Sequence, residues 1–326
     1  MSGNGATAPT RQVGIPLVPW AFIGLITVPL AVAATITWYR VMGGAIILGD
    51  IDWYASALPR LLSDQPLYDP AKLLPHVAER PPFWNQAPST ALMSLIMLGP
   101  GGGLLWGLVM IGGVVVGLAL VWPRVGPGGV ALLAPVLLVW PPVTEALAWA
   151  NVNALVFGLL AVAWRFPRAA GWAIGVASAA KLVPIIAVAW LIGKRDWRGA
   201  AVAVAILVMA TVVVLAWKGF GTLPDFITLR LNERPSEGAA GGVGFAAVTG
   251  LPQTVGYLAA AVLAVLALRF ASLSLAIVAM LFSVAELHLH YLTWLLIPII
   301  GIWIPWLLGH ARPQAADEQG MDPQMP

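Results

Sequence analysis

Long apolar runs separated by short polar stretches dominate this chain and restrict how it can fold. A run of about 17–25 apolar residues is long enough to cross the hydrocarbon core of a bilayer as a helix. Eight runs reach or approach that length, at about 16–39, 103–122, 128–142, 150–165, 199–217, 252–268, 270–284 and 291–308. Several are short, which indicates tilted helices, a locally thinned bilayer or broken helices.

The composition agrees with a membrane location and excludes some kinds of site. Only 10% of the residues are charged and 60% are hydrophobic, whereas soluble domains carry about 25% charged residues. The absence of cysteine excludes a disulfide framework and a thiolate metal site. We therefore predict an all-α polytopic protein with about 8 to 11 membrane helices.

The polar stretches divide this protein into tails, loops and one membrane domain. We expect a cytoplasmic tail at 1–15 and a single transmembrane domain at 16–308. Long outer loops are predicted at about 40–85 and 218–250. The segment 309–326 lacks apolar periodicity and is predicted to be a disordered cytoplasmic tail.

Two apolar segments do not fit a simple crossing. Segment 170–193 has basic residues at both ends, so we predict two half-helices that meet near Lys181-Leu182-Val183-Pro184, where proline disrupts the helical ladder. Such an irregular backbone at membrane depth needs a protein or aqueous lining. Segment 86–99 is predicted to be a dipping or surface-lying helix on the outer side.

The basic residues orient these segments, because cytoplasmic loops carry an excess of Lys and Arg. The residues expected on the cytoplasmic side are Arg124, Arg165, Arg168, the run Lys194-Arg195-Asp196-Trp197-Arg198, Arg269 and Arg312. The residues then expected near the opposite face are Asp50, Asp52, Glu145, Asn151, Asn153, Arg230, Glu233, Arg234, Glu237, His288 and His290.

Two carboxylates, Asp50 and Asp52, directly follow the first apolar run. Acidic residues are costly near hydrocarbon and usually serve a substrate, an ion or a proton path there. The alternative is a solvated cap on a helix close to the membrane. Two carboxylates without further ligands make a weak metal site, so we expect no cofactor, with a divalent metal as the alternative.

Several short motifs occur in an order that resembles a known family. They are Asp50-Ile51-x-Trp53-Tyr54-x-x-Ala57, Pro66-Leu67-Tyr68, Pro81-Pro82-Phe83, Ala150-Asn151-Val152-Asn153, Ala180-Lys181-Leu182-Val183-Pro184 and His290-Tyr291. The pattern resembles the polyprenyl-phosphate-mannose-dependent mannosyltransferases, which are class C glycosyltransferases of family 87. Arg80 replaces an aromatic residue of that pattern, and Asn151 replaces a glutamine.

The resemblance implies a multi-pass enzyme of the plasma membrane with a class C bundle. It would transfer a sugar, mannose in the family, from a polyprenyl-phosphate donor to a lipid or glycan acceptor at the extracytoplasmic face. Asp50 matches the family's general base, and Asp52 would support it. Membrane lipids are expected partners and nucleic acid is not.

The expected substrate-binding residues combine this resemblance with the chemistry of phosphate recognition, which needs cations or hydrogen-bond donors. They are Tyr54, Tyr68, Arg80, Asn151, Asn153, Lys181, Arg230, Arg234, His288 and His290. Arg230 and Arg234 are the main candidates for the donor phosphate. Their alternative role is to pair with Glu233 and Glu237 in a solvated loop, and Lys181 is either a phosphate ligand or an interfacial anchor.

A secondary transporter is the alternative function, because transporters also place polar groups at broken helices. Two features argue against it. The polar residues gather in predicted outer loops, and no broken segment in the other half of the chain matches 170–193.

The predicted topology can be tested with introduced cysteines, since the native chain has none. In Ser63→Cys, the thiol should react with a membrane-impermeant reagent only from the extracytoplasmic side. A cysteine within Lys194–Arg198 should react only from the cytosol. Labelling of Ser63→Cys from the cytosol alone would overturn the orientation.

Overall fold

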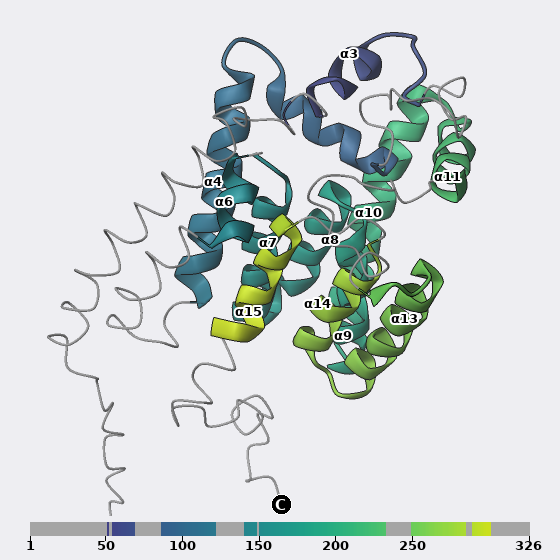
Figure 1. The fold of residues 1–326 in the computed structure, drawn as a ribbon. Helices are drawn as coiled ribbons and strands as arrows, with labels where there is room; N and C mark the ends of the chain where they lie inside the picture. The colour runs from purple at the N-terminus through teal and green to yellow at the C-terminus, as the bar shows by residue number, and fades with distance from the viewer. Residues whose placement is uncertain are drawn as a thin grey trace, which may run out of the picture.

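The computed structural model describes residues 51, 54–68, 86–121, 140–148, 150–232, 249–284 and 289–300, and every regular element among them is a helix (Figure 1). The predicted all-α class is therefore confirmed for these residues. Both predicted tails, the first span at 16–39 and most of the first outer loop lie outside the described residues.

The described elements are named here in the order of the chain. In order they are α3 (Ala57–Leu62), η2 (Pro88–Met97), α4 (Gly102–Val121), α6 (Pro141–Ala148), α7 (Asn153–Arg165), η4 (Pro167–Ala169), α8 (Ala170–Ala180), η5 (Val183–Ala187), α9 (Val188–Gly193), α10 (Trp197–Lys218), α11 (Thr222–Asn232), α13 (Gln253–Arg269), α14 (Leu273–Phe282), η6 (Leu289–Leu295) and α15 (Leu296–Pro298).

Two helices in the described part, α4 and α10, are long and apolar enough to cross a membrane. Only 33% of the most apolar window of α4 and 22% of that of α10 is buried. A core helix of a soluble protein would be mostly buried, so these exposed apolar faces suit contact with lipid. The predicted helices at 103–122 and 199–217 are confirmed.

The broken segment at 170–193 is also confirmed. Helix α8 ends at Ala180, and Lys181 is extended, with φ −156° and ψ 123°. The helix cannot continue because the ring of Pro184 would collide with the carbonyl of the residue four positions earlier. The chain then returns through η5 and α9, so that Arg168 before α8 and Lys194 after α9 line the same cavity.

Other elements differ from the sequence prediction in detail. Pro141–Ala148 forms helix α6 between the predicted runs at 128–142 and 150–165, because proline is favoured in the first turn of a helix, where no N–H bond is lost. Helix α11 occupies part of the predicted outer loop 218–250, and the predicted last span begins with the 3-10 helix η6. Segment 86–99 contains a separate helix, η2, as predicted.

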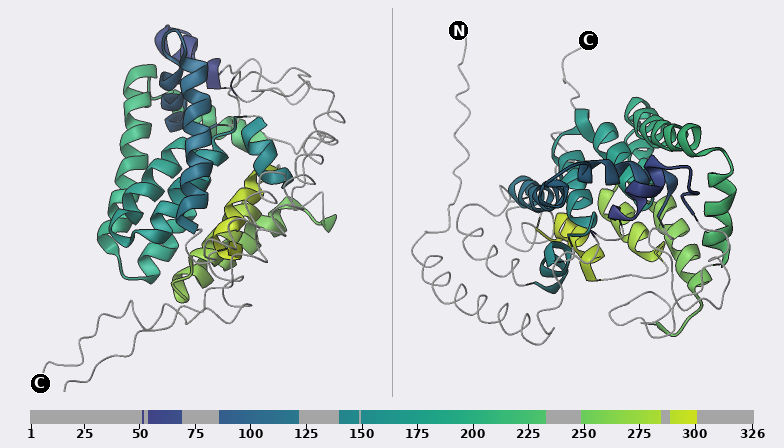
Figure 2. Two further views of the ribbon diagram at one scale, coloured as in Figure 1. Left: turned by 90° about the vertical axis from the view of Figure 1, so that its left-hand side faces the viewer. Right: turned by 90° about the horizontal axis from the view of Figure 1, so that it is seen from above.

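The chain path brings Arg165, Arg168, Lys194 and Arg198 to one end of the bundle. Helix α7 begins at Asn153 and ends at Arg165, and α8 returns toward Lys181. Helix α10 then leads from Arg198 to Lys218, which lies next to α3 (Figures 1 and 2). We call the part of the bundle from Asn153 and Lys181 up to α3 the polar end, and the opposite part the basic end.

Helices α4 and α7 cross closely because glycines remove the side chains between them. A Cβ atom added at Gly113 would overlap the carbonyl oxygen of Ala154, and one at Gly158 would overlap Gly113. This contact holds the start of α7, and thus Asn153, against α4.

The glycine crossing predicts a difference between two adjacent residues of α4. Gly113→Ala should lower the free energy of unfolding by about 1–3 kcal/mol, because it overpacks a close contact. Gly112→Ala is the matched control, since a Cβ there meets no atom within 4 Å, and it should leave stability unchanged or slightly higher. Thermal unfolding in detergent measures both. Equal behaviour of the two variants would contradict the crossing.

Candidate active site

The turn between α6 and α7 is held by backbone hydrogen bonds around Ala150. Its φ of 48° lies in the left-handed region, which is most easily adopted by glycine. The Ala150 N–H donates to the Leu147 carbonyl and the Asn151 N–H donates to the Ala146 carbonyl, the pattern of a Schellman helix end. The Trp106 indole N–H donates to the Ala150 carbonyl over 2.8 Å, tying the turn to α4.

Two asparagines follow this turn, and their side chains differ in what they do. The Asn151 Oδ1 accepts from the Asn153 N–H over 2.8 Å and so fixes the start of α7. The Asn153 side chain is fully buried, and neither its Nδ2 nor its Oδ1 has a hydrogen-bond partner in the described part of the chain. Buried amides normally have hydrogen-bond partners, so the Asn153 amide is available to form hydrogen bonds with a polar ligand.

The aromatic residues of η6 bring Lys181 next to Asn153. The Trp294 indole N–H donates to the Asn153 carbonyl over 3.4 Å. Tyr291 packs edge-on against Trp294, with ring centroids 5.2 Å apart. The Lys181 Nζ lies 3.9 Å from the centroid of the Tyr291 ring. This cation–π contact helps to retain a lysine that is only 7% exposed.

A contact between an acidic side chain and a histidine joins α6 to η6 at the same place. His290 Nδ1 lies 3.8 Å from Glu145 Oε1, and the His290 ring stacks on Tyr291 with centroids 5.1 Å apart. Both side chains of the pair are largely buried. Sequence reasoning placed Glu145 on this face without assigning it to the site. The signal was present, because an isolated acid in an apolar segment needs a partner.

The structure therefore brings together four of the predicted substrate-binding residues from three parts of the chain. They are Asn151, Asn153, Lys181 and His290, with Glu145, Tyr291 and Trp294 beside them. The cluster combines cationic groups, an amide and aromatic faces in a largely buried setting. Such a set can hold a polar or anionic ligand.

The two predicted tyrosines lie in the core. Tyr54 is 2% exposed and packs on Trp106, with ring centroids 4.7 Å apart. The Tyr68 hydroxyl donates to the Gln86 carbonyl over 2.6 Å. Burial raises the pKa of the Tyr68 phenol, so this hydroxyl stays protonated and acts as a donor. Because Trp106 also binds Ala150, Tyr54 connects the first motif to the asparagine turn.

The structure does not describe the side chains of the remaining predicted site residues. Asp50, Asp52, Arg80, Arg234 and His288 lie outside the described residues, and only the backbone of Arg230 is described, in α11. Lys218, a further basic residue that precedes α11, stabilises the end of a helix. Its Nζ donates to the carbonyls of Arg60 and Ser63 and so caps the end of α3.

Comparison with known proteins decides the class of this protein. The family description that matches is "Glycosyltransferase family 87", over residues 81–315. The chain belongs to glycosyltransferase family 87. It is therefore a glycosyltransferase, which uses a sugar donor and an acceptor. No curated protein and no solved structure matches the chain.

The extent of the match separates the candidate residues of this family 87 enzyme into two groups. Asn151, Asn153, Lys181 and His290 lie within the matched residues, as does their neighbour Glu145. Asp50, Asp52, Tyr54, Tyr68 and Arg80 precede the match, so their roles depend on the local motif and on the contacts of Tyr54.

The buried amide of Asn153 predicts a variant that keeps its stability but loses transferase activity. Leucine in Asn153→Leu has a similar volume and replaces an amide that has no partner among the described residues, so the free energy of unfolding should stay the same or rise. Sugar transfer should fall by about ten-fold or more if the amide binds substrate.

Asn151→Ala is the contrasting variant. It removes the acceptor that holds the Asn153 N–H and should cost about 0.5–2 kcal/mol of stability, as for loss of a helix cap. Thermal unfolding and transfer rate should be measured on both. Full activity of Asn153→Leu would remove this side chain from the site.

Proposed function

We propose that this family 87 enzyme transfers mannose from a polyprenyl-phosphate donor to a lipid or glycan acceptor. The observation that carries the proposal is the convergence of Asn153, Lys181 and His290 at the polar end, within the residues that match the family. Cations for a phosphate and an amide for sugar hydroxyls are the groups that such a donor needs.

The proposed reaction is a displacement at the anomeric carbon of the donor sugar. An acceptor oxygen forms the new bond to this carbon while the bond to the phosphate oxygen breaks. The acceptor proton moves to the Asp50 carboxylate, and polyprenyl phosphate leaves with one additional negative charge. General base catalysis of this kind contributes about 10²–10⁴-fold in rate.

The growing charge on the leaving phosphate requires cationic partners. Lys181 and His290 supply them in this proposal, with Arg230 and Arg234 contributing from the segment that begins in α11. Glu145 lies 3.8 Å from the His290 imidazole and positions it. Electrostatic stabilisation of developing charge is usually the largest contribution to catalysis.

Chain connectivity supports the assignment of Asp50 as the base. Asp50 precedes Tyr54 by four residues, a separation of no more than about 14 Å between Cα atoms. Tyr54 packs on Trp106, which binds the turn that carries Asn151 and Asn153. Asp50 and Asp52 are therefore within four residues of the contact that joins the first motif to this turn.

The proposal includes a multi-pass class C bundle with the polar end on the extracytoplasmic side. The apolar faces of α4 and α10 and the gathering of arginines and lysines at the opposite end support this orientation. No metal takes part in the proposed step. We do not propose transport, because the matched family is a transferase family.

Asp50→Asn tests the proposed base. Asparagine is nearly isosteric but cannot take up a proton at neutral pH, so transfer should fall by about 10²-fold or more while donor binding is retained. Asp52→Asn should cost less. Transfer is measured with purified protein, radiolabelled polyprenyl-phosphate mannose and a membrane-lipid acceptor.

Asp64→Asn is the matched control, since Asp64 is exposed after α3 and the chemical change is the same. It should leave the rate unchanged. If Asp52→Asn is inactive and Asp50→Asn is not, the base is Asp52 and the proposed transfer stands. If the native enzyme transfers no sugar from any polyprenyl-phosphate donor, the proposed donor class is wrong.

A further inference from the structure

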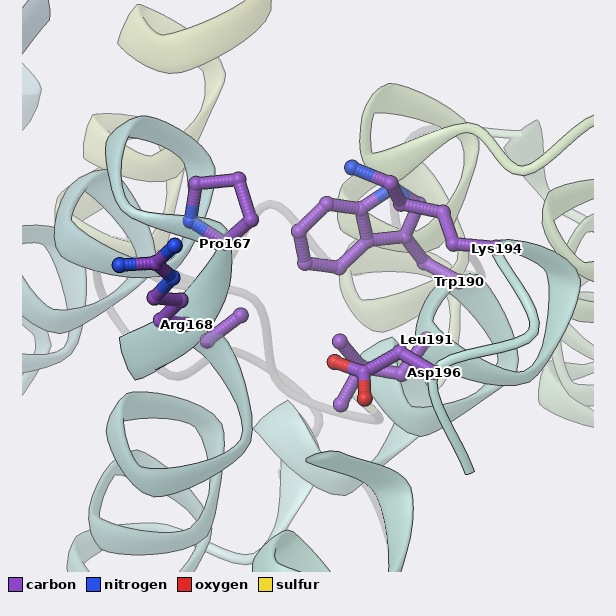
Figure 3. Close-up of a pocket in the computed structure, with 7 residues that line it drawn as sticks. Pro167, Arg168, Trp190, Leu191, Lys194 and Asp196 are labelled. Atoms are coloured by element: carbon purple, nitrogen blue, oxygen red, sulfur yellow. The ribbon is translucent and has the colours of Figure 1, made fainter. Parts of the chain in front are cut away.

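A second candidate site lies at the basic end, away from the asparagine turn. A cavity of about 280 Å³ opens between the start of α8 and the turn from α9 to α10 (Figure 3). Its lining residues are Pro167, Arg168, Ala170, Trp190, Leu191, Lys194 and Asp196. Helix α8 leads from this cavity to Lys181 at the polar end, so the two sites are separated by the length of that helix.

The cavity has an apolar floor and a charged rim. Ala170, Trp190 and Leu191 are buried. The side chains of Arg168 and Lys194 stand on opposite sides of the gap (Figure 3), and the Lys194 Nζ lies 5.2 Å from the centroid of the Trp190 ring. Arg168 and Lys194 thus line the cavity from two sides, and the planar guanidinium of arginine suits the oxygens of a phosphate.

The carboxylate of Asp196 also lines the cavity, and it stabilises the start of a helix. Its Oδ1 accepts from the Gly199 N–H over 2.8 Å and caps α10. The positive end of that helix offsets part of its charge. Asp196 is the one acidic side chain at this end within the described ranges, against the basic residues Arg165, Arg168, Lys194, Arg195, Arg198 and Arg269.

Exposed aromatic residues indicate the depth of the cavity relative to a bilayer. Phe166, Trp172, Trp197 and Phe270 are each 48–64% exposed and occur beside the basic residues, at or near the ends of α7, α8, α10 and α13. Tryptophan and other aromatic residues gather where lipid headgroups meet hydrocarbon. Trp172 and Trp197 at this end therefore suit a cavity that opens at the level of lipid headgroups.

We propose that this cavity binds the phosphate group of an anionic phospholipid. Arg168 and Lys194 contact the phosphate oxygens, while Trp190 and Leu191 contact the glycerol and the first methylenes. Basic pockets between membrane helices on the cytoplasmic side are suited to anionic headgroups. A free phosphate ion could bind the same cations, but it has no apolar group to contact the apolar floor.

Native mass spectrometry of the purified full chain in neutral detergent tests the proposal. The probes are phosphatidylglycerol, phosphatidylcholine with the same acyl chains, and inorganic phosphate. Phosphatidylglycerol should bind more tightly than phosphatidylcholine. Arg168→Gln and Lys194→Gln should each weaken its binding by about ten-fold, the effect of losing one charge-assisted contact.

Arg195→Gln is the matched control, because Arg195 is exposed at the same end and does not line the cavity. Equal weakening in this control would overturn the site in favour of general attraction to the basic end. Equal binding of both lipids would also overturn it. If inorganic phosphate binds in a way that depends on Arg168 and displaces the lipid, the phosphate site is supported, and its ligand is free phosphate instead of a lipid headgroup.

Asp196→Asn provides an independent readout, since asparagine also caps helices well and stability should be retained. Removing a negative charge from the rim should tighten binding of phosphatidylglycerol. Weaker binding in this variant, with an unchanged Tm, would show that the carboxylate holds part of the ligand and would overturn recognition of an anionic headgroup.

Discussion

The helix that begins at Ala170 cannot continue past Ala180, because Pro184 lacks an N–H and its ring would collide with the Ala180 carbonyl. Much of the described structure depends on this interruption. It reverses the chain, so that Lys181 lies at the polar end and Arg168 and Lys194 line one cavity at the basic end. A continuous helix would place the two ends of the segment far apart and would remove both sites.

The polar end shows how a mostly apolar bundle retains charged and polar groups. Lys181 lies over the Tyr291 ring, and His290 pairs with Glu145. Buried polar networks are costly when partly satisfied and rigid when complete. The amide of Asn153, which has no partner in the described part, marks a place where the fold keeps a polar group that stability alone does not require. That is expected where a ligand completes the network.

Close backbone contacts position this network. Gly113 and Gly158 let α4 and α7 approach until their backbones touch, and the Trp106 indole N–H binds the turn at Ala150. The start of α7 is therefore held by a rigid helix pair. Catalytic groups need such support, because small displacements reduce rates strongly. The basic end is built differently, from exposed cations and aromatic residues that suit a headgroup layer.

The amino-acid sequence alone determined the helical class, the positions of α4 and α10, and the break before Pro184. These features are local, because apolar run length and proline geometry act within a few residues. The sequence also placed Arg165, Arg168 and Lys194 at one end, since each follows or precedes an apolar helix. The motif order was sufficient to identify the glycosyltransferase family.

Only the tertiary structure decided which side chains meet. The pairing of Glu145 with His290, the burial of Tyr54 against Trp106, and the capping of α3 by Lys218 join residues far apart in the chain. Hydropathy determines that a helix forms, but not its rotation or tilt relative to its neighbours. Those are set by packing summed over several helices, so contacts between distant segments become definite only when the whole bundle has assembled.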